Sequence, residues 1–127
     1  MIELWIDGQP PRKSNNRRIV RRGRNGPPMS IKSQGALDWI RAANMQIPVD
    51  ARQCLGSLER PLRIRMDIYY KSRRPDLSGE LVLDLLQTVG VISDDRYVYA
   101  WELYKHFDKE RPGIAIRVEY LNNDEAE

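Results

Sequence analysis

Residues 62–90, LRIRMDIYYKSRRPDLSGELVLDLLQTVG, contain the two patterns that decide the fold. In the first part, apolar side chains alternate strictly with the others, which predicts a β-strand with one buried face. The buried set is expected to be Leu62, Ile64, Met66, Ile68 and Tyr70. In the second part, Leu81, Leu85 and Val89 recur at helical spacing, which predicts an amphipathic helix over residues 79–89 that stops at Gly90.

The segments before this stretch predict one strand, one loop and one helix. Residues 2–6 alternate apolar and polar side chains and indicate a strand. Residues 12–32 lack periodicity and contain Gly and Pro, so we expect a mobile basic loop there. Ser33 is expected to cap a helix over about residues 34–47, which Pro48 would end.

After the stretch, residues 97–105 and 113–121 predict a β-hairpin joined by a polar loop. The order of elements then predicts an α+β fold, a small single domain with a mixed sheet of about four strands and two main helices. A chain of 127 residues fits one domain, which we place at residues 1–121, with an acidic tail at 122–127.

The charge of the chain is small overall but uneven. The net charge is +3, yet residues 12–32 contain eight Lys or Arg and neither Asp nor Glu. Such a basic block is typical of nucleic-acid binding, because Lys and Arg contact phosphates without reading sequence. The expected DNA contacts within and near this block are Arg12, Lys13, Asn15, Asn16, Arg17, Arg18, Arg21, Arg22 and Arg24. The alternative is a solvated linker.

Cysteine content and hydropathy indicate the cellular compartment of the protein. The single cysteine, Cys54, excludes an internal disulfide and fits a reducing cytoplasm. No apolar run reaches the length that spans a membrane. We therefore expect a cytoplasmic protein with no membrane partner.

A second group of charges lies in residues 71–95. Lys71, Arg73 and Arg74 precede three acids at four-residue steps, and an adjacent acid pair follows the helix. These acids are Asp76, Glu80 and Asp84, and then Asp94 and Asp95. Clustered carboxylates repel one another unless a cation or a proton relieves them, and Mg²⁺ binds carboxylates together with substrate phosphates. The pattern predicts a metal-assisted site that acts on a polyanion. Each acid alone has a simpler interpretation, as a helix cap or a turn residue.

Two segments together resemble a known family. PPRKSNNRR near the start and RRPDLSGELVLDLLQTVGVISDDRYV in the middle are similar to the motifs of RusA-type Holliday junction resolvases. The resemblance covers nearly the whole chain. It implies a RusA-like fold and a small homodimeric endonuclease, often encoded by phages or prophages, that resolves four-way DNA junctions by paired nicks in recombination and repair. It also implies Mg²⁺ as cofactor, with Mn²⁺ as an alternative ion.

The resemblance assigns roles to the acids. Asp76 matches the first acid of the family's Asp-x-Asp motif, Asp95 matches the catalytic acid of its Asp-Asp pair, and Asp84 matches the helix acid. Ser78 stands where the second acid is expected, so Glu80 is the candidate replacement. A rival register aligns Asp76 with the second acid and Arg74 with the first. The proline directly before Asp76 favours the former.

These assignments give a defined set of expected site residues. The catalytic set is Asp76, Glu80 and Asp95, and the metal ligands are Asp76, Glu80, Asp94 and Asp95. Lys71, Arg73 and Arg74 are expected to position the scissile phosphate. The alternative function is a junction-binding relative with weakened or absent catalysis, because Ser78 replaces a family acid.

Overall fold

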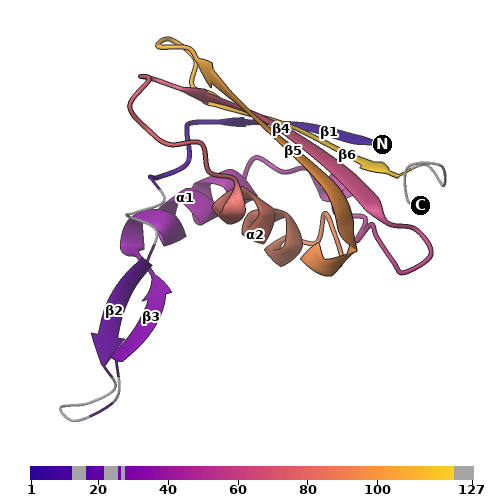
Figure 1. Ribbon diagram of the computed structural model, residues 1–127, viewed down its shortest axis with the longest axis horizontal. Coiled ribbons are helices and arrows are strands. Elements are labelled where there is room, and N and C mark those ends of the chain that lie inside the picture. The colour runs from indigo at the N-terminus through magenta and orange to yellow at the C-terminus, as the bar shows by residue number, and fades with distance from the viewer. Residues whose placement is uncertain (13–16, 22–25, 27, 122–127) are drawn as a thin grey trace.

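The computed structural model describes residues 1–12, 17–21, 26 and 28–121, and consists of a twisted four-stranded sheet with both α-helices on one face (Figure 1). The sheet order is β1-β6-β4-β5, and a separate pair of strands, β2-β3, projects from the start of α1. The strands are β1 (Ile2–Asp7), β2 (Arg17–Arg21), β3 (Pro28–Lys32), β4 (Leu62–Tyr70), β5 (Val98–Phe107) and β6 (Gly113–Tyr120). The helices are α1 (Gln34–Asn44) and α2 (Glu80–Thr88), with two 3-10 turns, η2 (Val49–Ala51) and η3 (Asp95–Tyr97).

The alternating stretch is confirmed as the central strand β4. Its five predicted inward side chains are all buried, and Ile64, Met66 and Ile68 are fully so. They pack against α2, whose Leu81, Val82, Leu85 and Leu86 are buried in the same core. The small α+β fold with a four-stranded mixed sheet and two helices is therefore confirmed.

Both predicted helices exist, with shorter limits. The Ser33 hydroxyl accepts a hydrogen bond from the backbone N–H of Ala36 at 3.2 Å, which is the expected cap. The helix α1 ends at Asn44 instead of residue 47, although Ile47 beyond it is still buried. After α2, Gly90 adopts a φ of +82°, a conformation that glycine reaches without strain.

The predicted hairpin of residues 97–105 and 113–121 is wrong. Both segments are strands, but they lie on opposite sides of β4. β5 runs parallel to β4 because α2 returns the chain to the start of β4, whereas β6 pairs antiparallel with both β4 and β1. The inner position suits β6, because Ile114, Ile116 and Val118 are buried, while the more polar β5 takes the edge.

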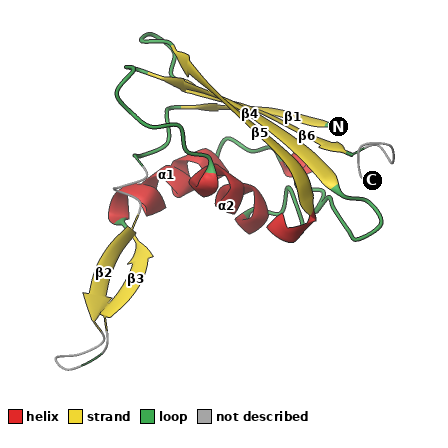
Figure 2. Ribbon diagram, viewed as in Figure 1, coloured by secondary structure: helices red, strands yellow, loops and turns green. Residues whose placement is uncertain are grey.

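The predicted irregular loop at residues 12–32 also needs correction. Within it, β2 and β3 pair antiparallel from Arg17 opposite Lys32 to Arg21 opposite Pro28 (Figure 2). A β-branched pair, Ile19 and Val20, favours the extended conformation, and this weak preference is easily hidden among so many arginines. The strands β2 and β3 thus form a two-stranded arm outside the main sheet.

Candidate functional site

Tyr70, at the end of β4, positions the segment that carries the first acids. Its hydroxyl donates a hydrogen bond to the backbone carbonyl of Asp76 at 3.3 Å and accepts one from the backbone N–H of Ser78 at 3.4 Å. Burial raises the pKa of Tyr70, and the charges of Asp76 and Glu80 raise it further. Both carboxylates therefore lie near this phenol, at the start of α2.

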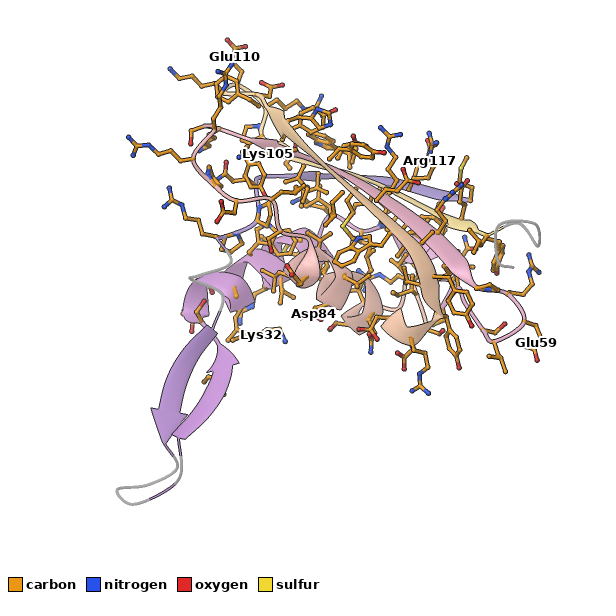
Figure 3. All side chains as sticks on the ribbon, viewed as in Figure 1. Lys32, Glu59, Asp84, Lys105, Glu110 and Arg117 are labelled. Carbon is orange, nitrogen blue, oxygen red and sulfur yellow. The ribbon has the colours of Figure 1, made fainter. Side chains whose placement is uncertain are left out.

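Helix α2 carries the next acids on successive turns. The helix begins at Glu80, so Asp76 precedes it and does not share its face through helical spacing. Glu80 and Asp84 are four residues apart and do share a face. Asp84 lies on the side of α2 that points away from the sheet (Figure 3). The hydroxyl of Ser78 donates a hydrogen bond to the Glu80 carboxylate and so orients it.

The adjacent acid pair lies in the turn after α2. Asp94 caps η3 by accepting a hydrogen bond from the backbone N–H of Arg96 at 3.0 Å. Its carboxylate also forms an ion pair with the Arg96 guanidinium at 2.8 Å. These contacts lower the pKa of Asp94 to about 2. Asp94 therefore remains ionised at neutral pH.

Asp95 has the opposite electrostatic character. A hydrogen bond with Asp94 raises the pKa of Asp95, and slight burial and the charges of Asp94 and Asp84 raise it further. The backbone N–H of Asp95 donates to the Gln87 side chain at 3.2 Å, which ties the turn to α2. Acids from two separate segments, Asp84 on α2 and Asp95 after it, thus lie close enough to affect each other.

Asp94→Asn should lower the pKa of Asp95, because asparagine carries no charge to oppose ionisation of its neighbour. An NMR titration of the Asp95 side-chain carboxyl carbon measures this shift. A titration curve that coincides with that of the wild type would contradict the described coupling.

Asp94 and Asp95 make contributions to folding stability that depend on pH in opposite directions. A raised pKa means that the folded protein holds the Asp95 proton more tightly than the unfolded chain, so that contribution is present at low pH and is lost as pH rises through the folded pKa. The contribution of Asp94 is present above its ordinary value of 3.8 and is lost as pH falls toward about 2. Arg96→Gln should therefore lower the thermal unfolding midpoint at neutral pH more than at pH 2, because the ion pair with Asp94 is lost only where Asp94 is ionised.

The structure brings together only some of the expected metal ligands. Asp76 and Glu80 lie near enough to Tyr70 for their charges to act on its phenol, and Asp84 lies near enough to Asp95 for its charge to act on that carboxyl. Among the residues that the structure describes, no group of three or more His, Cys, Asp or Glu side chains is placed to hold a metal ion. Asp84 was outside the expected ligand set. Its four-residue spacing from Glu80 was the sequence signal that pointed to it.

The expected basic contacts fall into two regions. Lys71, Arg73 and Arg74 are exposed in the connection between β4 and α2. The Arg73 carbonyl accepts a hydrogen bond from Lys105 at 2.9 Å, and the backbone N–H of Lys71 donates to Gln9 at 2.7 Å. This anchored connection leads directly into the acidic row, the name we give to Asp76, Glu80, Asp84 and Asp95.

The other region is the arm. Arg12 is exposed before it, and Arg17, Arg18 and Arg21 belong to β2. Lys13, Asn15, Asn16, Arg22 and Arg24 lie outside the described residues.

Neither protein-family models nor curated proteins give a match to this chain. In the part of the chain that the structure describes, neither α1 nor α2 nor any other helix combines the length and apolarity needed to cross a bilayer.

Proposed function

We propose that this protein is a Mg²⁺-dependent, structure-selective DNA endonuclease that resolves four-way junctions by paired nicks. The observation that carries the proposal is that Asp84 on α2 and Asp95 in η3 lie close enough for the charge of one to act on the other, and that α2 follows directly after an exposed basic connection. Carboxylates next to a phosphate-binding surface are the groups that metal-assisted phosphodiester hydrolysis needs.

The donor set fits magnesium by chemical type. Mg²⁺ in phosphate chemistry usually binds one or two carboxylates, with waters and substrate phosphates as its other ligands. Asp95 and Asp84 would hold the ion, with Glu80 one helical turn away and Asp76 beyond it. When bound, such an ion lowers the pKa of a coordinated water and stabilises the leaving oxygen.

Side chains of the protein would prepare and position the ligands for the ion. Asp95 must lose its proton before it can serve as a ligand, and its raised pKa places that step closer to neutral pH than for an ordinary aspartate. Asp94, paired with Arg96, keeps its charge and orients the turn. Tyr70 fixes the backbone of residues 76–78, so that Asp76 and Glu80 stay at the start of α2.

The basic residues would hold the DNA backbone. Replacing both Arg73 and Arg74 by Gln should weaken junction binding and make the slope of log K against log salt less negative by about 2, because two phosphate contacts are lost. Fluorescence anisotropy at several salt concentrations measures the slope. The matched control replaces Arg60 and Arg117, which removes the same charge from other parts of the surface; Arg117 lies on the sheet face opposite the helices (Figure 3). Equal slopes in the two double variants would contradict this role.

The assay that tests the function compares a four-way junction with flaps, forks and linear duplex, in Mg²⁺ and in EDTA. We expect symmetric paired nicks in the junction only when the metal is present.

The second candidate function is a junction-binding protein without turnover. It is favoured by Ser78, which stands where a second acid would be expected and is hydrogen-bonded to Glu80. Junction binding in Ca²⁺ with no nicking in Mg²⁺ or Mn²⁺ would support it, and Ser78→Asp should then raise activity.

A further inference from the structure

The sheet face opposite the helices, on which Arg117 lies, contains a hollow (Figure 3). Ala115 of β6 is opposite Trp5 of β1 on one side and opposite Asp67 of β4 on the other. Because its methyl group is much shorter than the side chains around it, Ala115 forms the floor of an open hollow of about 580 Å³. This volume is within the range of small-molecule sites, roughly 300–1,000 Å³.

Trp5 forms one wall of the hollow and is held from two sides. Its indole N–H donates a hydrogen bond to the Asp7 carboxylate at 2.6 Å. Its ring lies against Gly113, where a Cβ would come within 2.4 Å of the indole, so only glycine leaves room for it. Ala115, two residues along the same face, stays partly exposed. A fixed aromatic wall beside an open floor suits a flat ring, which can pack against the indole.

Asp67 and Arg65 of β4 form the opposite wall. The Arg65 guanidinium donates hydrogen bonds to the Asp67 carboxylate at 3.0 and 3.4 Å, and Nε2 of His106 lies 2.7 Å from the same carboxylate. Partial burial opposes ionisation of Asp67, but the hydrogen bonds from Arg65 and His106 outweigh it and lower the pKa of Asp67. This wall is therefore charged at neutral pH and fixed in orientation by its partners.

Two arginines meet at one end of the hollow. Arg65 and Arg117 are directly opposite each other in the antiparallel pairing of β4 and β6, and like charges in such positions destabilise a sheet. Each has an acidic partner, Asp67 for Arg65 at 3.0 Å and Glu3 for Arg117 at 3.3 Å. The two arginine side chains are still 45% and 50% exposed, and a guanidinium has more N–H donors than one carboxylate occupies. An anion bound between them would relieve the remaining repulsion.

We propose that this hollow binds a small molecule that combines a flat aromatic ring with a carboxylate or a phosphate. The ring would lie on Ala115 against Trp5, and the anionic group would bind Arg65 and Arg117, because the guanidinium fork matches both kinds of anion. A long polyanion suits the hollow less well, since the carboxylates that pair with the two arginines also line it. The site is on the other side of the sheet from α2, so it is separate from the acidic row and does not rest on the proposed nuclease activity.

An NMR chemical-shift titration of the isotope-labelled protein is the first test. The probes are naphthoate and adenosine monophosphate, each compared with its uncharged counterpart, naphthamide or adenosine. We expect at least one charged probe to shift the backbone amides of residues 3–5, 65–67 and 115–117, and to bind roughly 10-fold or more tightly than its counterpart. Binding of naphthoate alone would identify carboxylates as the ligand class, and binding of adenosine monophosphate alone would identify phosphates. No shifts in these residues at millimolar probe, or equal affinity for the uncharged counterparts, would overturn the proposal.

Two variants then test the floor and the charge separately. Ala115→Leu should abolish binding, because the larger side chain fills the hollow. Arg117→Gln should weaken binding of the charged probe by roughly 10-fold or more, because a charge-assisted hydrogen bond is lost. The matched control, Arg41→Gln, removes the same charge from α1, where the side chain is 75% exposed, and should leave binding unchanged.

Circular dichroism and the thermal unfolding midpoint check that both variants fold as the wild type does. Wild-type affinity in either folded variant would contradict the proposed site. Junction cleavage should be unchanged in Arg117→Gln, so loss of ligand binding and loss of nuclease activity can be told apart.

Discussion

Asp95→Asn should reduce the rate of four-way junction cleavage by about 100-fold or more, because the variant keeps the shape of the side chain but loses the negative charge that would hold the ion. Junction binding should change little, since the basic residues that contact phosphates are intact. The measurement is single-turnover nicking of a labelled junction over a range of Mg²⁺ concentrations. A higher Mg²⁺ requirement would identify Asp95 as a ligand.

The matched control for this variant is Asp50→Asn. Asp50 is an exposed aspartate in the turn η2, outside the acidic row, and the same loss of one charge there should leave cleavage unchanged. Asp84→Asn should fall between the two if Asp84 shares the ion with Asp95. If Asp95→Asn cuts the junction as fast as the wild type, the metal site proposed on α2 is wrong.

Leu85→Ala should lower the free energy of unfolding by about 2–5 kcal/mol, because it deletes a large apolar group and leaves a cavity. Leu85 is fully buried and lies on the face of α2 that packs against β4. Since a domain of this size is stable by only about 5–15 kcal/mol, this change should move the urea midpoint strongly. Equilibrium unfolding followed by tryptophan fluorescence measures it.

Leu58→Ala is the control for the core variant. Leu58 is 71% exposed, so the same truncation should change the free energy of unfolding by less than about 0.5 kcal/mol. A similar loss in both variants would mean that α2 does not contribute to the core as described.

Sequence periodicity predicted the elements well where one face of an element is buried. The alternation in residues 62–70 and the helical spacing after it identified β4 and α2 to within one residue, because burial imposes a fixed period on apolar side chains. The arm strands β2 and β3 were missed, because they form a separate pair with no such alternation in their sequence.

Strand order could not be predicted from local patterns. The segments of β5 and β6 follow one another in the chain, which favoured a hairpin, yet β4 lies between them. Which strand takes the centre depends on how completely each side chain is buried in the assembled sheet, and this comparison involves segments far apart in sequence.

The candidate site likewise combines features that are local in the sequence with features that depend on the assembled fold. By itself, the amino-acid sequence determined which residue types are available, namely the basic connection, the acids of α2 and the Asp94–Asp95 pair, because charge and spacing are local properties. Only the tertiary structure decided which of them interact: the charge of Asp84 acts on Asp95, while the charges of Asp76 and Glu80 act on Tyr70. The physical reason is that the turn after α2 folds back along the helix, held by Gln87, and no local pattern encodes that return.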